Sequence, residues 1–185
     1  MSGQEAEAPA AAHRRRQLLL AAVGAGAALA GAGVAWRKWR PQAVPGDAAA
    51  AIWPLKFPTP AGGSLDMANL RGRPLLLNFW ATWCPPCVEE MPLLDQFYLE
   101  NVANGWQVVG LAIDQAEPVR QFLSRLPVSF PIGLAAQGGQ ELSRALGNLA
   151  GGLPFTVVVG SDGDLRQRRI GRVTAADLAQ WRTLR

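Results

Sequence analysis

Two cysteines, Cys84 and Cys87, are the residues of this chain whose type and spacing are best suited to chemistry. They are its only cysteines and enclose two prolines in the run Trp83-Cys84-Pro85-Pro86-Cys87. If a helix begins here, a spacing of three residues places both thiols on its first turn, close enough to form a disulfide. Unpaired amides and the dipole at a helix N-terminus lower the pKa of a thiol, which predicts Cys84 as the nucleophile and Cys87 as the better shielded resolving thiol. Thiol–disulfide exchange is therefore favoured over a static disulfide or two inert thiols.

Other chemistries lack the residues that they need. The only histidine, His13, lies in the N-terminal tail, so the expected folded domain has none for a Ser-His or Cys-His mechanism. Two cysteines alone do not complete a four-ligand zinc site. We therefore expect no metal and no other cofactor.

The residues on either side of the cysteine pair predict a strand and a helix. Residues 75–80 (LLLNFW) form a nearly continuous apolar run, which is typical of a strand buried on both faces. A helix is predicted from about Cys84 to Asn101, with Met91, Leu94 and Leu99 among its inward residues. Alternating strands and helices elsewhere predict an α/β fold, with a central mixed sheet flanked by helices. The other elements are expected as an edge hairpin from residue 57 to 66, strands over 106–113, 155–159 and 165–170, and helices over 118–126, 140–146 and 174–184, the last capped by Thr174.

The N-terminal region differs from the rest of the chain in charge and hydropathy. The first 45 residues carry the whole net charge of +4, and the remainder is neutral. Because the basic residues flank an apolar stretch rather than cluster on the folded domain, a nucleic-acid partner is not expected. The 19 residues 18–36 are uncharged, and as a helix they rise about 28 Å, close to the thickness of a bilayer core. The expected parts are a basic cytoplasmic tail (1–16), a transmembrane helix or signal segment (17–36), a linker (37–51) and the folded domain (52–185).

The apolar segment has three interpretations. An uncleaved membrane anchor with its N-terminus in the cytoplasm is the one we favour. A cleaved signal is the second, since Ala28-Leu29-Ala30 is a plausible cleavage site and Arg15-Arg16 begins a run similar to a twin-arginine signal. A buried soluble helix is the third, and the three consecutive arginines at its start argue against it.

Several runs together resemble the thioredoxin superfamily, and within it the membrane-anchored TlpA/ResA-like branch. The resemblance spans roughly residues 52–184 and implies a thioredoxin-like fold with thiol–disulfide oxidoreductase activity. The runs that carry it are residues 77–87 (LNFWATWCPPC), 90–92 (EMP), 109–114 (VGLAID) and 152–159 (GLPFTVVV), with Asp162-Gly163 and Gly171.

The resemblance implies roles for residues beyond the cysteines. Pro154 matches the family's cis-proline, which lies against the active-site disulfide. The backbone at the adjacent Leu153 is then expected to pair with an extended substrate segment, and Trp83 to contribute to substrate binding.

An acidic residue and an amide are also implicated. Glu90 matches a glutamate that in ResA-like proteins helps to set the cysteine pKa and to relay protons. Its alternative is a solvated glutamate at the start of a helix, which is also our interpretation of Glu89. Asn78 stands where cytoplasmic thioredoxins carry a buried aspartate, so acid–base assistance must come from Glu90 or water. Residues 132–137 lack the acidic turn often seen in relatives, and we interpret them as loop variation.

The resemblance predicts a protein-disulfide reductase in the periplasm, tethered to the bacterial inner membrane by a single N-terminal helix. Its expected partners are disulfide-bearing protein substrates, such as apo-cytochrome c or copper-site assembly proteins, and a thiol–disulfide electron donor in the membrane. A dithiol oxidase and a redox-inert binding module are the alternatives. A protein released by cleavage and soluble in the periplasm is the alternative location.

Overall fold

The computed structural model describes residues 48–184. The expected tail, the expected membrane or signal segment and residues 37–47 of the expected linker lie outside the described residues. Between residues 48 and 184, no helix has both the length and the apolar character needed to cross a membrane.

A five-stranded mixed sheet forms the centre of the domain. Its strands, in spatial order, are β5 (Ile132–Leu134), β4 (Gln107–Ala112), β3 (Leu75–Trp80), β6 (Phe155–Val159) and β7 (Leu165–Ile170). β3, β4 and β5 are parallel, while β6 is antiparallel to both β3 and β7. Every residue of the three central strands is buried, as their apolar runs predict for strands covered on both faces.

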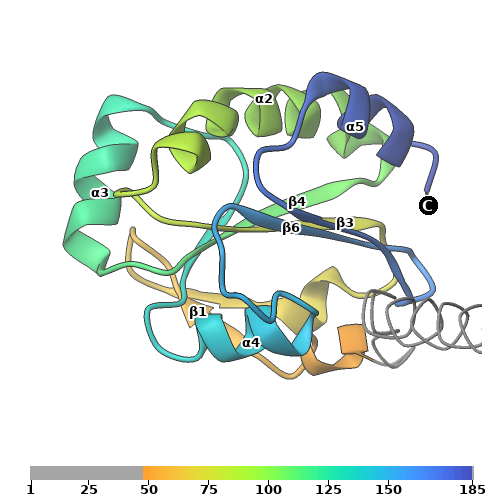
Figure 1. The fold of residues 1–185 in the computed structure, drawn as a ribbon, viewed down its shortest axis with the longest axis horizontal. Helices are drawn as coiled ribbons and strands as arrows, with labels where there is room; N and C mark the ends of the chain where they lie inside the picture. The colour runs from red at the N-terminus through yellow and green to blue at the C-terminus, as the bar shows by residue number, and fades with distance from the viewer. Residues whose placement is uncertain (1–47, 185) are drawn as a thin grey trace, which may run out of the picture. The chain divides into compact units, whose positions relative to one another are not determined.

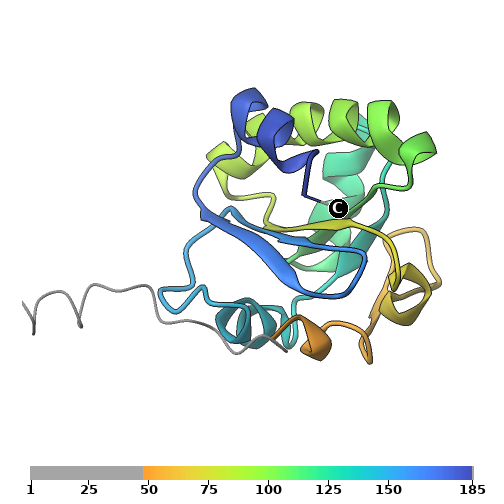
Figure 2. The ribbon, with the colours of Figure 1, turned by 90° about the vertical axis from the view of Figure 1, so that its right-hand side faces the viewer.

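Helices cover both faces of this sheet, so the domain has three layers (Figure 1, Figure 2). Successive side chains of a strand point to opposite faces, and Leu76 and Trp80 of β3 therefore join one core cluster while Leu77 and Phe79 join the other. The first cluster includes residues of α2 (Pro85–Asn101), α3 (Ala116–Arg125) and α5 (Ala175–Trp181). The second includes residues of α4 (Gly139–Ala145) and of the 3-10 turns η1 (Ala48–Ala51) and η2 (Met67–Leu70).

The expected N-terminal hairpin is present as a separate two-stranded sheet. β1 (Lys56–Pro58) pairs antiparallel with β2 (Ser64–Asp66), and its turn includes Gly62 with a φ of 81°, where a side chain would be strained. The hairpin lies close to β5, because a Cβ on Gly133 would come within 2.9 Å of the Phe57 Cβ. A glycine in β5 therefore permits the hairpin to cover this edge of the second cluster.

The predicted elements agree with the structure, with ends shifted by up to three residues, except at three places. The strands over 155–159 and 165–170 are confirmed with their predicted bounds. Thr174 caps α5 as predicted, through a reciprocal pair of bonds with Asp177. The interpretation of residues 132–137 as a loop is wrong for the first half, because Ile132–Leu134 forms β5 alongside β4, whereas residues 135–137 have no regular structure. A strand of three residues with a central glycine shows little alternation of apolar and polar residues and has low β-propensity. The strand β5 is therefore recognised only by its pairing with β4.

The second difference concerns α2. Met91 and Leu94 are fully buried as predicted, but Leu99 is 57% exposed and its predicted inward orientation is wrong. Met91, Leu94 and Phe97 follow one stripe at intervals of three residues. Leu99 comes two residues after Phe97, about 200° around the helix, and therefore lies on the opposite side.

The third difference is at the start of the domain. The last four residues of the expected linker, Ala48–Ala51, form a 3-10 turn, and Ala49 is fully buried in the second core cluster. The interpretation of this stretch as a linker with little burial is therefore wrong. A methyl side chain needs little space, and alanine composition alone does not reveal whether it is packed.

Candidate active site

The two cysteines are joined in a disulfide at the N-terminus of α2. Cys84 is the N-cap residue, in an extended conformation, and Cys87 lies in the first turn, where its N–H and that of Val88 both donate to the Cys84 carbonyl. Cys84 retains 5% exposure and Cys87 none. Only Cys84 is therefore placed to meet another protein's sulfur, and Cys87 is shielded behind it.

The two prolines between the cysteines occupy the first two helical positions. Pro85 and Pro86 have no N–H, so they leave no unpaired amide at positions where an α-helix has no acceptor to offer. The amides that remain at this terminus belong to Cys87 and Val88. The prolines therefore fix the start of the helix and reduce the number of amides available to a Cys84 thiolate.

The turn that precedes the disulfide is tied to β4. The Thr82 N–H and hydroxyl both donate to Asp114 Oδ2, at 3.0 and 2.5 Å. Asp114 follows β4 by two residues, and its Oδ1 accepts from the Gln115 N–H at 2.7 Å. Trp83, the next residue, points out with 66% exposure. The motif VGLAID includes Asp114, but the sequence alone did not indicate that it reaches Thr82.

The Leu153–Pro154 peptide bond is cis, as the resemblance implies. Pro154 is buried and its carbonyl accepts from the Gly171 N–H at 2.8 Å. The loop before it is held by the buried Asn148, whose Nδ2 donates to the Gly152 carbonyl at 2.8 Å. Leu153 is half-buried and packs against both core clusters, the first of which includes both cysteines. Because Phe155 pairs with Phe79 near the end of β3, Leu153 and Pro154 lie at the end of the sheet where the turn to the disulfide begins.

Glu90 is buried, with 1% exposure, on the side of α2 that faces the sheet. Its Oε1 accepts from Asn78 Nδ2 at 2.7 Å, and its Oε2 accepts from the Val173 N–H at 2.8 Å. Burial raises its pKa from 4.5 to about 7, against the opposing effect of these two hydrogen bonds and of Arg172. The alternative interpretation of Glu90 as a solvated helix-start residue is therefore wrong.

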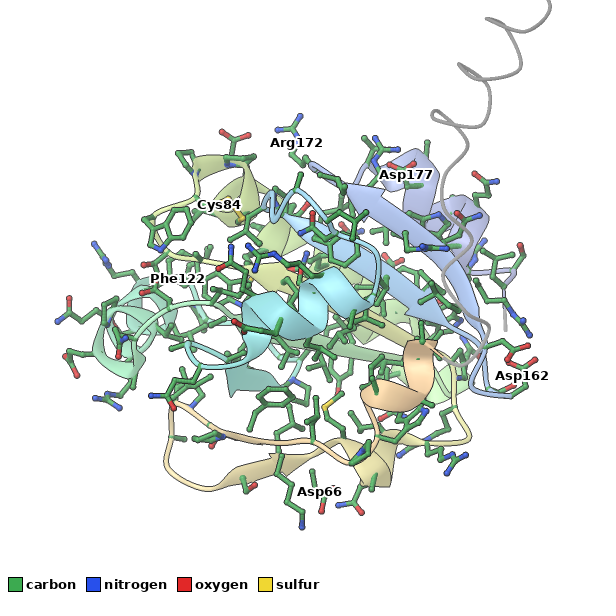
Figure 3. The ribbon with its side chains drawn as sticks, turned by 60° about the horizontal axis from the view of Figure 1, so that its bottom comes forward. Asp66, Cys84, Phe122, Asp162, Arg172 and Asp177 are labelled. Carbon is green, nitrogen blue, oxygen red and sulfur yellow. A yellow bond between two sulfur atoms is a disulfide. The ribbon has the colours of Figure 1, made fainter. Side chains whose placement is uncertain are left out.

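Glu89, by contrast, is exposed, and it forms an ion pair with Arg172 at 2.6 Å. This pair joins α2 to the segment after β7. Figure 3 shows Arg172 and Cys84 at the same margin of the domain. The expectation that Glu89 is the solvated member of the two glutamates is confirmed.

Asn78 and Thr156 complete the buried polar group. Both are fully buried, and Asn78 Nδ2 donates to the Thr156 hydroxyl at 3.0 Å as well as to Glu90. The Asn78 Oδ1 has no hydrogen-bond partner among residues 48–184. Thr156 was not identified from the sequence, although it is the only polar residue of the run FTVVV. A lone polar residue in a buried strand was the available signal, since such a group needs a partner.

The part of the chain that the structure describes contains no group of three or more His, Cys, Asp or Glu side chains able to hold a metal ion. The polar groups near the disulfide are instead a thiol pair, a carboxyl group and an amide. Such groups can exchange disulfides and move protons.

Comparison with known proteins gives consistent results. The Redoxin family model matches residues 45–181. The thiol-disulfide oxidoreductase ResA of Bacillus thuringiensis (strain Al Hakam) is 30% identical over 118 residues, which cover 63% of this chain and 66% of ResA. This chain thus spans slightly less than two thirds of that relative's length.

Two solved structures share the fold. A thiol:disulfide interchange protein of the thioredoxin family from Chlorobium tepidum TLS is 28% identical with a TM-score of 0.61, over 70% of this chain and 90% of that one. A secreted Mycobacterium tuberculosis disulfide oxidoreductase, homologous to E. coli DsbE, is 25% identical with a TM-score of 0.59, over 71% and 96%. With a disulfide at a helix N-terminus, a cis-proline at the same end of the sheet and a family match over residues 45–181, this chain belongs to the Redoxin family of the thioredoxin superfamily, as a ResA/TlpA-like protein.

Proposed function

We propose that this protein is a thiol–disulfide oxidoreductase that reduces disulfides of other proteins, with Cys84 as nucleophile and Cys87 as resolving thiol. The observation that carries the proposal is the unequal burial of the two cysteines at the N-terminus of α2. Cys84 lies at the surface of the turn and Cys87 behind it. This asymmetry suits a reaction in which one sulfur meets the substrate and the other completes the transfer.

The reaction begins with both cysteines reduced. The Cys84 thiolate attacks one sulfur of the substrate disulfide, the substrate S–S bond breaks, and a mixed disulfide forms while the other substrate sulfur leaves as a thiolate. The Cys87 thiolate then attacks Cys84 Sγ and releases the second substrate thiolate, which takes up a proton. Two electrons pass to the substrate, and the enzyme is left with the Cys84–Cys87 disulfide seen in the structure.

Glu90 is the group that we propose to take the Cys87 proton. It follows Cys87 by three residues, so the two side chains share the buried side of α2. A pKa of about 7 lets its carboxyl group exist in both protonation states near neutral pH. The Cys87 thiol lies in an apolar site and needs a group that accepts its proton when it becomes a thiolate. The buried carboxylate of Glu90 is that acceptor.

The surface around the disulfide supports a protein substrate. Five large apolar side chains are exposed in the described part of the chain, and three of them lie near the site. One is Trp83, the residue directly before Cys84. Leu149 and Ile170 flank the Leu153–Pro154 segment, since Ile170 pairs with Phe155 and Leu149 lies in the loop before the cis bond. Exposed apolar residues around a reactive site are typical of protein contacts. Leu153 lies outside β6, two residues before its start, and its N–H and C=O are the groups that we propose to pair with an extended substrate segment.

The direction of electron transfer and the cellular location of the protein depend on each other. An exported compartment is oxidising, so a reductase there needs electrons delivered through the membrane, and a tether keeps it near a thiol–disulfide donor. The DsbE-homologous neighbour is described as secreted. We propose an inner-membrane location with the domain in the periplasm, and apo-cytochrome c or copper-site assembly proteins as substrates. N-terminal sequencing of membrane and soluble fractions tests the tether, and a start near Gly31 in both would contradict it.

The direction is tested by the reduction potential of the Cys84–Cys87 couple, measured on the full-length chain equilibrated with a dithiol buffer. A value near or below roughly −230 mV supports a reductase, whereas one near about −120 mV indicates a disulfide donor. The third possibility, a redox-inert binding module, is tested by Cys84→Ser. Full retention of biological function in that variant would contradict catalysis by the cysteine pair.

A further inference from the structure

Asp114 is a charged residue that the reaction described above does not use. It lies two residues after the parallel strand β4, at the same end of the sheet as the turn after β3 that carries the disulfide. Its carboxylate accepts three hydrogen bonds, two from Thr82 and one from the Gln115 N–H. A carboxylate that binds both the amide and the hydroxyl of one residue restrains that residue's backbone and side chain together.

Thr82 stands two residues before Cys84, and an extended chain rises at most about 3.6 Å per residue. The Cα atoms of Thr82 and Cys84 are therefore within about 7 Å of each other. The Asp114 carboxylate, bonded to Thr82, thus belongs to the same turn as Cys84. The turn is further closed by the Cys84 N–H, which donates to the Ala81 carbonyl at 3.2 Å, and by the Ile113 N–H, which donates to the Trp80 carbonyl at 2.8 Å.

We propose that Asp114 is a positioning residue for the disulfide reduction proposed above, which holds the turn of Cys84 and disfavours the Cys84 thiolate by its negative charge. A couple is strongly oxidising when its reduced form is stabilised. A negative charge beside the attacking sulfur has the opposite effect, because it destabilises the reduced thiolate form. Asp114 thus makes the couple more reducing, and it offsets part of the effect of the helix N-terminus on the Cys84 thiol.

The other ionisable groups around this turn include the Cys87 thiol, the buried Glu90 and the exposed Glu89–Arg172 pair, on α2 or beside it. Lys56 of β1 lines a cavity together with Asp114, and it is paired with Asp66 at 2.8 Å. None is in the hydrogen-bonded group that Asp114 forms with Thr82 and Gln115. Asp114 also borders a cavity of about 470 Å³ between β1 and the turns that follow β4 and β5. Its charge is therefore accessible to dissolved ions, and its effect on Cys84 should decrease with salt.

The test measures the pH dependence of Cys84 alkylation in the reduced full-length chain, together with the reduction potential. Asp114→Asn removes the charge but keeps an oxygen that can accept from Thr82. We expect the Cys84 thiolate fraction, at a pH below the thiol pKa, to rise about threefold to tenfold. The reduction potential should become less negative. Asp114→Glu, which restores a carboxylate, should return the profile toward that of the unchanged chain.

Matched variants separate the effect of the Asp114 charge from the effect of its hydrogen bonds to Thr82. Thr82→Val loses the hydroxyl donor but keeps the Asp114 charge and the hydrogen bond from the backbone N–H of residue 82. The Cys84 thiolate fraction should therefore stay within about twofold of that in the unchanged chain. Gln115→Lys and Gln115→Glu change an exposed side chain, while the hydrogen bond to Asp114 comes from the backbone N–H of residue 115 and is kept. We expect the lysine to raise the thiolate fraction and the glutamate to lower it, with both differences reduced in 1 M salt. This pair also keeps the test available if Asp114→Asn does not fold.

An alkylation profile that is unchanged in both Asp114→Asn and Gln115→Lys would overturn the proposal, as would equal shifts in Asp114→Asn and Thr82→Val. These measurements need no substrate, so they are independent of the proposed function. If Cys84→Ser retains full biological function, the reductase assignment fails while the result for Asp114 stands.

Discussion

The two faces of the central sheet are built from the same strands but differ in chemistry. On the face toward α4, the inward residues of β3 and β6 are entirely apolar: Leu75, Leu77, Phe79, Phe155, Val157 and Val159. On the face toward α2, the same strands place Asn78 and Thr156 beneath Glu90, among otherwise apolar side chains. The first face is a continuous apolar core, whereas the second buries a carboxyl group beside the disulfide, at a cost in stability.

The comparison shows how a period of two residues separates packing from reactivity. Neighbouring residues of β3, such as Asn78 and Phe79, serve opposite faces because the strand alternates. Substitutions one position apart should therefore have different consequences. Four predictions test this division, in order of their expected effect on stability.

Phe79→Ala should have the largest effect. Phe79 is fully buried on the α4 face and lies 5.7 Å from Phe155, ring centroid to centroid. Removal of the ring should lower the free energy of unfolding by about 3–5 kcal/mol. The measurement is urea denaturation, with Phe79→Leu as the smaller truncation. The reduction potential of the variant at low denaturant should equal that of the unchanged chain, and a clear change in it would contradict the separation of the two faces.

The second prediction is a pH dependence that arises from the α2 face. The folded-state pKa of Glu90 is raised to about 7 from 4.5, so the folded chain binds the proton more tightly than the unfolded chain. Its contribution to stability is fully present below about pH 4.5 and is lost as the pH rises through about 7, with a total loss of about 3 kcal/mol. Unfolding free energies measured from pH 4.5 to 8 should show this decrease. Glu90→Gln should flatten it, and an equal slope in both proteins would assign the dependence to other groups.

Asn78→Leu should have an intermediate effect that depends on pH. Asn78 donates to Glu90 and lowers its pKa, so loss of the amide should move that pKa above about 7. We expect a loss of about 1–3 kcal/mol in unfolding free energy at pH 8, where Glu90 ionises without its partner, and a smaller loss at pH 5. Thr156→Val is the control, because it removes the hydroxyl but leaves the Asn78–Glu90 bond intact. A pH profile of thiol–disulfide exchange that shifts equally in both variants would contradict the role of Asn78.

Ile170→Ser should have the smallest effect on stability, under about 0.5 kcal/mol, because the side chain is 56% exposed. It should instead raise KM for a disulfide-bonded protein substrate, with kcat little changed. Leu99→Ser is a matched control, since Leu99 is 57% exposed and lies near the far end of α2. Equal KM values for the two variants would show that the apolar residues beside Pro154 do not contact the substrate.

Much of the site was predictable because it lies in one continuous stretch. The strand, the turn, the cysteine pair and the helix occupy residues 75–101, and their patterns are local. Pro154 and Glu90 were identified through their match to family positions. The partners Thr156, Val173 and Asp114 were missed because each meets the site through a contact across 32 to 83 positions of the chain, and a single sequence contains no direct signal of such pairing.

The chemistry of the site and most of the layers of the fold follow from the order of the amino acids. Two cysteines on a first helical turn, without a histidine in the domain, leave disulfide exchange as the chemistry, and apolar runs with a period of two or of 3.6 specify strands and helices. The polar groups that surround the sulfur atoms, in contrast, are brought there by folding. The pKa of Glu90 depends on its burial between α2 and the sheet and on donors from β3 and from Val173, two residues before α5. The Cys84 turn depends on the Asp114 carboxylate, two residues after β4. Electrostatic effects depend on distance and solvent exclusion, and both exist only once the chain has folded.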